Sequence, residues 1–318
     1  MSRLSVVVPV YFNSDTLEAL YEDLKKKVFS EIPDHELVFV DDGSEDASWE
    51  LMNRIREDDP EHIKCVKLSR NFGEHAALLA GLSVCTGDCA VTKQADLQED
   101  SAIIPQMFES WKKGNDVVLA VRSGREDPVM KKAAAALYYR IINRFVEKNM
   151  PVGGCDCYLI DRKVIEVLKL LGEKNSSLTL QVLWSGFQTD RIYFHRDERK
   201  EGISRWTFSK KVKLALDSMM SFSYFPIRFM TALGFVFAVL SLIWIIEIII
   251  EKFVVGTPIA GWASLMCLNL FTSGAVMLMV GVIGEYVWRT LDASRSRPPF
   301  IIDRMEPEKE EKEKENDK

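Results

Sequence analysis

Two long stretches without a charged side chain, near the C-terminal end, most constrain what this chain can fold into. Residues 229–246 contain 18 uncharged positions in a row, and residues 253–284 contain 32. Because about 20 helical residues cross a bilayer core of about 30 Å, each stretch is long enough to span a membrane once. A buried helical hairpin of a soluble protein is the alternative, but helices that are apolar on all faces are rare there. We therefore predict two transmembrane helices within residues 228–288.

The charges that flank these stretches predict their orientation. Residues 196–228 carry eight Arg and Lys against four acidic side chains, and residues 289–304 carry four Arg against two acids. The connection between the stretches holds a single basic residue, Lys252. Because basic flanks stay in the cytosol, we predict an integral membrane protein with two spans, whose N-terminal domain and both termini are cytosolic.

Two further segments combine an apolar face with basic side chains. In residues 207–227, apolar side chains recur at helical spacing and lysines lie opposite them, which predicts an interfacial helix lying in the headgroup plane. Residues 131–148 show the same pattern, with five basic side chains beside the apolar face. Packing of either helix onto a soluble core is an equal alternative on this pattern.

The first 120 residues alternate short apolar runs with segments of helical spacing. The predicted strands cover residues 5–10, 36–40, 63–68, 89–92 and 116–121. Nearly continuous Val, Leu and Phe strands joined by helices are typical of a mostly parallel sheet covered on both faces. We therefore predict an α/β fold for residues 1–206. Ligands of such sheets bind beyond the carboxyl ends of the strands.

Polar side chains follow each predicted strand at that edge of the sheet. Asp41 and Asp42 follow the second strand, and Gln94, Asp96 and Gln98 follow the fourth. The chain has neither the GxGxxG of dinucleotide-binding proteins nor the GxxxxGKS/T of P-loop proteins. Carboxylate and amide oxygens instead suit Mg²⁺ or Mn²⁺, which neutralises a departing diphosphate. Taken alone, however, DDGS is more simply a turn and a helix N-cap.

Six motifs in order along the chain resemble those of family 2 glycosyltransferases with the GT-A fold. They read VVPVYFN, VDDGSED, LSRNFGEHAALLAG, QADLQED, VRSGRED and RKEGISRW. More narrowly, they are similar to those of polyprenyl-phosphate glycosyltransferases, which include dolichyl-phosphate mannose synthases and bacterial undecaprenyl-phosphate glucosyltransferases. The match covers about residues 4–210, and the paired stretches followed by RSRPPFII resemble the C-terminal part of the bacterial members. The resemblance implies a protein of the bacterial plasma membrane.

For the donor site, the resemblance implies a set of side chains at the strand ends. The nucleoside would be held by Pro9, Tyr11, Asp41, Asp42 and Gly73, and the metal and diphosphate by Gln94, Asp96 and Gln98. Related proteins usually carry Asp where this chain has Gln94, so one charge is missing from the cation site. An amide oxygen still serves as a ligand, and Mg²⁺ or Mn²⁺ stays the expected cofactor. The substitution also leaves open a catalytically weak or inactive sugar-nucleotide-binding partner protein.

The implied catalytic set extends into the second half of the domain. It comprises Asp96, Arg122, Asp156, Arg199 and Arg205, with Lys131 or Lys132 as a further basic position. The arginines would grip the acceptor phosphate, although attraction to anionic lipid also explains Arg199 and Arg205. Asp156 stands where related sugar transferases carry a base. A phosphate monoester is largely ionised at neutral pH, so orienting the sugar or the acceptor is the alternative role of Asp156.

The resemblance thus implies an inverting hexosyltransferase. It would transfer a sugar from a nucleotide-diphospho-sugar, expected to be a UDP-sugar, to polyprenyl phosphate at the cytosolic membrane face, in cell envelope glycosylation. Related enzymes commonly assemble as homo-oligomers. A processive polysaccharide synthase is a further alternative, but such enzymes normally have more spans and a QxxRW signature, where this chain has GISRW.

Composition bounds the partners and the remaining segments. The chain carries 41 basic and 47 acidic side chains, a net charge of −6, so nucleic acid is not an expected partner. Residues 305–318 hold seven acids and four lysines, which predicts a disordered acidic tail after a basic cytosolic segment, residues 289–304. The six cysteines and four histidines show no zinc-site spacing in the sequence.

Overall fold

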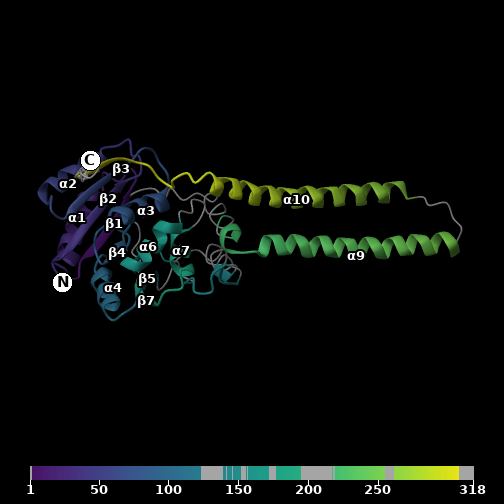
Figure 1. The fold of residues 1–318 in the computed structure, drawn as a ribbon, viewed down its shortest axis with the longest axis horizontal. Helices are drawn as coiled ribbons and strands as arrows, with labels where there is room; N and C mark the ends of the chain where they lie inside the picture. The colour runs from purple at the N-terminus through teal and green to yellow at the C-terminus, as the bar shows by residue number, and fades with distance from the viewer. Residues whose placement is uncertain are drawn as a thin grey trace, which may run out of the picture. The chain divides into compact units, whose positions relative to one another are not determined.

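The computed structural model describes residues 2–122, 139–140, 142–144, 146–151, 155, 157–171, 177–194, 217, 219–254 and 261–307. The chain divides into two compact units, drawn in Figure 1. The first unit is Met1–Asp217 with Pro298–Lys318, and the second is Ser218–Arg297. The hydrophobic stretches therefore form a unit of their own, inserted into the chain of the first.

The first unit contains a single eight-stranded sheet with helices between its strands. Its elements are β1 (Leu4–Val10), α1 (Leu17–Leu24), η1 (Lys25–Phe29), β2 (His35–Asp41), α2 (Ser48–Asp58), β3 (Ile63–Leu68), α3 (Glu74–Val84), β4 (Cys89–Thr92), α4 (Ile103–Lys112), β5 (Val117–Arg122), β6 (Tyr158–Asp161), α6 (Arg162–Leu171), α7 (Leu178–Trp184), β7 (Thr189–Phe194) and β8 (Ile302–Glu306). The strand order is β7-β5-β6-β4-β1-β2-β3-β8. β6 and β8 run antiparallel to their neighbours, and the other strands are parallel to one another. The predicted α/β fold with a mostly parallel sheet is confirmed.

The five strands predicted from the apolar runs lie within one residue of the expected bounds. Every residue of β1 and of β2 is buried. Complete burial is typical of parallel strands that are covered by helices on both faces. Such strands are apolar at nearly every position, so an uninterrupted apolar run predicts them.

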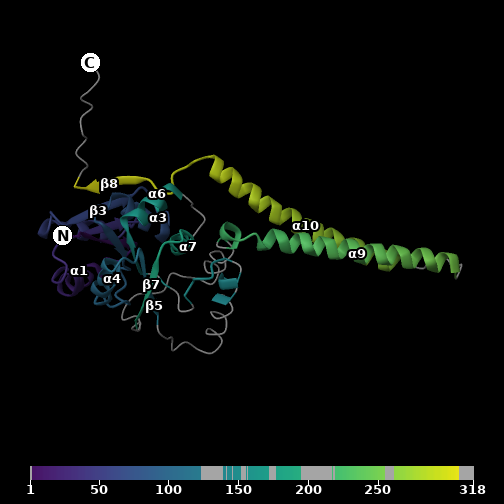
Figure 2. The same cartoon turned by 60° about the horizontal axis from the view of Figure 1, so that its bottom comes forward.

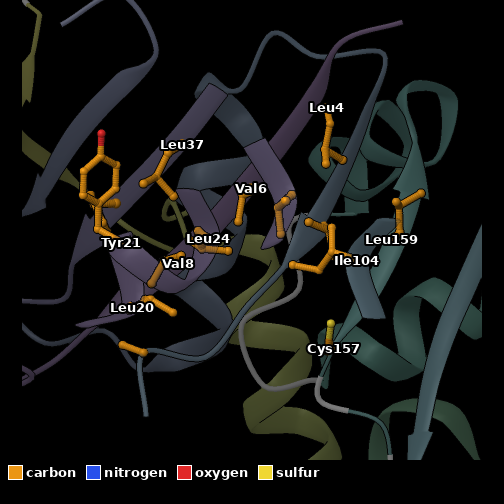
Figure 3. Packing of buried hydrophobic residues seen from close by; sticks show 14 of the residues in the cluster. Leu4, Val6, Val8, Leu20, Tyr21, Leu24, Leu37, Ile104, Cys157 and Leu159 are labelled. Atoms are coloured by element: carbon orange, nitrogen blue, oxygen red, sulfur yellow. The ribbon is translucent and has the colours of Figure 1, made fainter. Parts of the chain in front are cut away.

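Side chains of the central strand β1 alternate between two hydrophobic clusters. Val6 and Val8 join the cluster that includes helices α1, α2 and α4, part of which Figure 3 shows. Val7 joins the other cluster, with α3, α6 and α7. α3 lies so close to β1 that a Cβ at Gly81 would collide with Cγ1 of Val7. Close packing on both faces fixes the sheet, and with it the positions of the strand ends.

β8 lies in a part of the chain that the sequence assigned to a basic segment and an acidic tail. Figure 2 shows β8 (Ile302–Glu306) beside β3 at the edge of the sheet. The two strands pair antiparallel, with Met305 opposite Val66. Ile302 and Met305 also pack against the second cluster. The predicted boundary at residue 305 therefore needs correction, because Met305 and Glu306 belong to the sheet. Residues 308–318 lie outside the described part of the chain.

The second unit consists of two long helices, α9 (Phe225–Val254) and α10 (Trp262–Ser294). The rings of Phe237 and Phe271 meet at 5.3 Å, and Tyr286 Oη donates to the carbonyl oxygen of Ser223 at 3.4 Å. Ser223, just before α9, contacts a residue late in α10, whereas Phe237, further along α9, contacts a residue earlier in α10. The two helices are therefore antiparallel. Both pass the length and composition test for a membrane span, and they extend beyond the predicted limits of 228 and 288.

The two predicted amphipathic helices fall mostly outside the described residues. Within 207–227, residues 217 and 219–222 are helical and 225–227 begin α9, and within 131–148, residues 139–140 and 142–144 are helical. Whether these helices lie on a membrane stays a prediction from their sequence pattern.

Candidate active site

The carboxyl ends of β1, β2, β4 and β5 face one edge of the sheet, and the side chains that follow them form the candidate site. β1 is the strand at which the order reverses, with β2 on one side and β4 on the other. The loops after β1 and β4 meet here, because Thr16 Oγ1 donates a hydrogen bond of 2.7 Å to the carbonyl oxygen of Ala95. Ligands of open α/β sheets bind at such a switch point.

The loop after β1 presents an aromatic ring on a fixed backbone. The amide of Phe12, whose φ is +54°, donates to Ser44 Oγ at 3.0 Å, and the amide of Asn13 donates to Ser48 Oγ at 3.1 Å. The Tyr11 side chain is 37% exposed, with its ring edge-on to that of Phe12 at 4.7 Å. An exposed ring held in this way suits stacking on a flat ligand, while the predicted Pro9 lies buried inside β1.

The two carboxylates at the carboxyl end of β2 are buried and accept hydrogen bonds from the backbone. Asp42 accepts from the amides of Phe72 at 2.7 Å and Gly73 at 2.9 Å. Asp41 accepts from the amide of Ser44 at 2.9 Å. Burial raises the pKa of Asp42 to about 6 despite its two bonds, and burial also raises the pKa of Asp41. Asp42 therefore joins the end of β2 to the loop after β3.

Two glycines allow this close approach of loops. Gly43 has a φ of +73°, and a Cβ there would lie 2.6 Å from the carbonyl carbon of Arg70. Gly73, which the sequence assigned to the base pocket, has a φ of +98° and directly precedes α3. Glycine adopts this left-handed backbone without the strain that a Cβ introduces.

The loop after β4 carries the three predicted cation ligands. Gln94 donates from Nε2 to Glu74 Oε1 at 2.6 Å. Asp96 Oδ1 accepts from the backbone amide of Gln98 at 3.2 Å, and the intervening Leu97 has a φ of +56°. All three ligand candidates are partly buried. Carboxylate and amide oxygens gathered on one short, constrained turn are a donor set that fits Mg²⁺ or Mn²⁺.

Buried cations hold the far end of this loop. Lys93 is 1% exposed, and its Nζ donates to the carbonyl oxygen of Glu99. Arg122, predicted to grip the acceptor phosphate, is 7% exposed, and its Nη2 lies 3.9 Å from Glu99 Oε1. Neither Lys93 nor Glu74 was predicted from the sequence as a site residue. The only sign of Lys93 was a lysine at the end of an otherwise apolar strand.

The other predicted catalytic residues lie outside the described part of the chain. These are Asp156, Arg199 and Arg205, together with Lys131 and Lys132. Their proximity to the strand ends therefore stays a prediction. The neighbours of Asp156 are described: Cys155 and Cys157 are buried free thiols, and Cys155 Sγ donates to the carbonyl oxygen of Cys157 at 3.0 Å.

A cluster at the opposite, amino-terminal edge was not expected from the spacing of the histidines. His35 at the start of β2 stacks on His62 with 4.7 Å between ring centroids, and His62 Nδ1 lies 2.7 Å from Asp59 Oδ1. Ligand atoms of these three side chains lie within 4.8 Å of one another, close enough to hold a metal ion. Folding brings together histidines that are far apart in sequence, so linear spacing did not indicate this cluster.

Comparison with known proteins places the chain among sugar transferases. A sequence model of the family described as "Glycosyl transferase family 2" matches residues 5–169. The chain is 35% identical over 301 residues to "Uncharacterized glycosyltransferase YkcC" of Bacillus subtilis (strain 168), covering 94% of this chain and 93% of that one. It is 35% identical over 303 residues to "Bactoprenol glucosyl transferase" of Shigella phage SfX, covering 94% and 98%. It is 34% identical over 306 residues to "Prophage bactoprenol glucosyl transferase homolog" of Escherichia coli (strain K12), covering 95% and 99%.

Among solved structures, the chain is similar to the mannosyltransferase PcManGT from Pyrobaculum calidifontis, solved in complex with GDP-Man and Mn²⁺. The TM-score is 0.50 at 16% sequence identity, and the match covers 69% of this chain and 63% of that chain. The chain thus spans less than two thirds of that protein. The likeness is one of fold, and it agrees with the predicted GT-A architecture.

Proposed function

This chain belongs to glycosyl transferase family 2, and we propose that it transfers a sugar from a nucleotide-diphospho-sugar to polyprenyl phosphate at the cytosolic face of a membrane. The proposed donor is a UDP-sugar, and the proposed acceptor is undecaprenyl phosphate of a bacterial plasma membrane. The products are a nucleoside diphosphate and a polyprenyl-phosphate-linked sugar. Membership of the family makes the chain a glycosyltransferase, and the substrates and the membrane face are the proposal.

The observation that carries this proposal is the extent of the similarity to a bactoprenol glucosyl transferase. The similarity covers 94% of the chain at 35% identity, so it includes both the sheet and the pair of long helices. The name of that relative supports a lipid acceptor. Two helices of membrane length support a site that is held at the surface where the phosphate of such an acceptor lies.

The chain's own residues would bind and orient the two substrates. Tyr11 and the loop after β2 hold the nucleoside, and Gln94, Asp96 and Gln98 hold the diphosphate end together with Mg²⁺ or Mn²⁺. When bound, the cation neutralises the negative charge that develops on the leaving diphosphate. Arg122, Arg199 and Arg205 bind the acceptor phosphate, and Asp156 orients the sugar or the acceptor.

The transfer is a single displacement with inversion. An oxygen of the acceptor phosphate attacks the anomeric carbon, and the bond from that carbon to the donor diphosphate breaks as the new bond forms. The nucleoside diphosphate leaves with the electron pair. A phosphate monoester, with a second pKa of about 6, is already ionised at neutral pH, so the acceptor gives up no proton and needs no general base.

The second unit supplies the membrane attachment in this proposal. α9 and α10 cross the bilayer once each, with both termini in the cytosol. Arg289, Arg295 and Arg297, near the end of α10, lie on the cytosolic side in that arrangement. We also propose a homo-oligomer, as the family resemblance implies.

The test uses the full-length protein in lipid nanodiscs with undecaprenyl phosphate and a panel of UDP- and GDP-sugars, with and without Mn²⁺. Mass spectrometry of the lipid fraction should show one phosphate-linked sugar. Asp96→Ala should lower the rate by about 100-fold or more, because the cation that stabilises the negative charge on the leaving diphosphate loses its charged ligand. Asp100→Ala on the same loop is the matched control, since Asp100 is exposed and pairs with Lys27. Sugar-nucleotide binding without any lipid product would overturn the proposal and favour a non-catalytic binding protein.

A further inference from the structure

We propose that Glu74 is a positioning residue for the cation site: it turns the side-chain amide of Gln94 so that the amide oxygen is the metal ligand, and it supplies negative charge that the amide lacks. This inference rests on the function proposed above. Glu74 is the first residue of α3, and its Oε1 accepts a hydrogen bond of 2.6 Å from Nε2 of Gln94, two residues beyond β4.

The hydrogen bond from Gln94 to Glu74 determines whether the oxygen or the NH₂ group of the Gln94 amide points away from Glu74. An ionised carboxylate accepts hydrogen bonds and donates none, so Glu74 must meet the NH₂ group of Gln94 and not its oxygen. The amide oxygen is consequently directed away from Glu74. Because Mg²⁺ and Mn²⁺ bind oxygen in preference to amide nitrogen, this orientation is the one a cation requires. Partners of this kind fix the geometry of ligating groups in metal sites.

Glu74 also changes the charge at the site. Among the three predicted ligands, Gln94 and Gln98 are neutral, so Asp96 is the one with a formal charge. A carboxylate bonded to Gln94 adds a second negative charge beside these ligands, where partial burial weakens screening by water. The position at the first turn of α3 favours that charge, because the amides at a helix N-terminus attract anions.

The neighbours of Glu74 leave its charge available. Within the described part of the chain, no Lys or Arg forms an ion pair with it, and its hydrogen bond goes to the neutral Gln94. The ring nitrogens of the adjacent His75 are inaccessible and have no hydrogen-bond partner there, and neither does Tyr158 Oη. Burial lowers the pKa of His75 and raises that of Tyr158, so both neighbours are neutral at pH 7. Among the described residues, therefore, no basic side chain neutralises Glu74, and a bound cation would.

The experiment measures Mn²⁺ binding directly, by electron paramagnetic resonance of the full-length protein with UDP present. Glu74→Gln should weaken Mn²⁺ binding by about 10-fold, the lower end of the range for residues that hydrogen-bond to a metal ligand. The exchanged pair Glu74→Gln with Gln94→Glu should restore it, because the carboxylate and the amide then trade places on side chains of equal length. Glu50→Gln is the matched control, since Glu50 lies exposed in the first turn of α2. Its Mn²⁺ affinity should equal that of the wild type.

Thermal unfolding in EDTA separates positioning from a structural role. If Glu74 acts on the cation site, Glu74→Gln and the wild type unfold at similar temperatures without metal and differ when Mn²⁺ is present. Should Glu74→Gln fail to fold, Glu74→Asp takes its place, and weaker Mn²⁺ binding is again the expected result.

The two proposals fail in different ways. Wild-type transfer activity combined with unchanged Mn²⁺ affinity in Glu74→Gln would overturn the inference about Glu74 and leave the proposed function standing. The absence of both transfer and Mn²⁺ binding in the wild type would overturn the proposed function itself, and the inference with it.

Discussion

Each end of β2 carries a buried carboxylate, and the protein surrounds the two in different ways. At the amino end, Glu36 accepts hydrogen bonds from Ser5 Oγ at 2.6 Å, Lys64 Nζ at 2.8 Å and Thr86 Oγ1 at 2.9 Å. At the carboxyl end, Asp42 accepts from two backbone amides, at 2.7 Å and 2.9 Å. One carboxylate is paired with a lysine, and the other has neutral donors.

The pKa values follow from this difference. Burial alone would raise the pKa of Glu36, but the bonds from Lys64, Ser5 and Thr86 outweigh it and lower that pKa to about 2. Burial dominates at Asp42 and raises its pKa to about 6. A buried carboxylate that is paired with a basic side chain, as Glu36 is, stabilises the fold. A buried carboxylate that has only neutral donors, as Asp42 has, can accept further hydrogen bonds from a ligand. β2 thus joins an end that stabilises the fold to the end at which we propose that the sugar nucleotide binds.

The largest effect is expected at the structural end. Glu36→Gln removes the partner of Lys64 and turns an NH₂ group toward donors, so we expect the free energy of unfolding to fall by about 3 kcal/mol. Denaturation of the full-length protein in detergent measures this loss, with exposed Glu31→Gln as the control. Nucleotide binding at low temperature should be unchanged. A fall in nucleotide affinity without a loss of stability would show that the two ends of β2 do not differ as described.

The next effect concerns the loop at the functional end. Gly43→Ala combines a positive φ with a Cβ that would lie 2.6 Å from backbone, so we expect a loss of about 2 kcal/mol in stability together with weaker UDP binding. Gly114→Ala is the control, because Gly114 has a φ of +100° but no atom within 4 Å of an added Cβ. Equal losses in the two variants would mean that the close approach of Arg70 has no energetic weight.

A smaller effect is expected for Asp42 itself. Asp42→Asn keeps the shape of the side chain but turns an NH₂ group toward a backbone amide, which should cost about 1 kcal/mol of stability. We expect UDP affinity, measured by calorimetry at pH 7.5, to fall by about tenfold because the negative acceptor is lost. Asp58→Asn, an exposed change at the end of α2, should alter neither quantity. Unchanged UDP affinity in Asp42→Asn would make Asp42 as structural as Glu36.

The smallest effect is on the pH dependence of stability, in which the two carboxylates have opposite signs. The stability that Glu36 contributes is fully present above its ordinary pKa of 4.5 and is lost as the pH falls toward about 2. Asp42 binds its proton more tightly in the folded than in the unfolded chain, so stability falls as the pH rises from 3.8 to about 6. Unfolding temperatures between pH 3 and 7 should show that fall in the wild type and not in Asp42→Asn. Its persistence in Asp42→Asn would assign it to another group.

The parallel part of the sheet could be predicted because burial on both faces leaves an apolar run at each strand. The three strands that were not predicted give weaker local signals. β6 is buried at three of its four residues but runs directly into α6, β7 has no buried residue, and β8 is a short charged segment whose partner, β3, lies far away in the sequence. These strands are determined by long-range pairing, which a local pattern does not contain.

The sequence predicted which side chains of the candidate site follow the strands, but not which groups of the protein they bind. A position just beyond a strand predicts where Asp42 and Gln94 lie. It does not predict that Asp42 accepts from the loop after β3 or that Gln94 donates to Glu74, because both bonds depend on how separate loops fold against each other. The burial of Lys93 was not predicted, because a lysine at the end of an apolar strand normally reaches solvent.

The position of β8 after the two long helices limits how many times the chain can cross a membrane. Seven strands of the sheet precede α9, and the eighth follows α10. If α9 and α10 span a membrane as we propose, the chain leaves the compartment of the sheet and has to return to it before β8 can pair with β3. Only an even number of bilayer crossings then allows all eight strands to pair. In that arrangement, deleting one long helix would place residues 302–306 on the other side of the membrane and leave the edge of β3 unpaired, so membrane insertion and completion of the sheet would depend on each other.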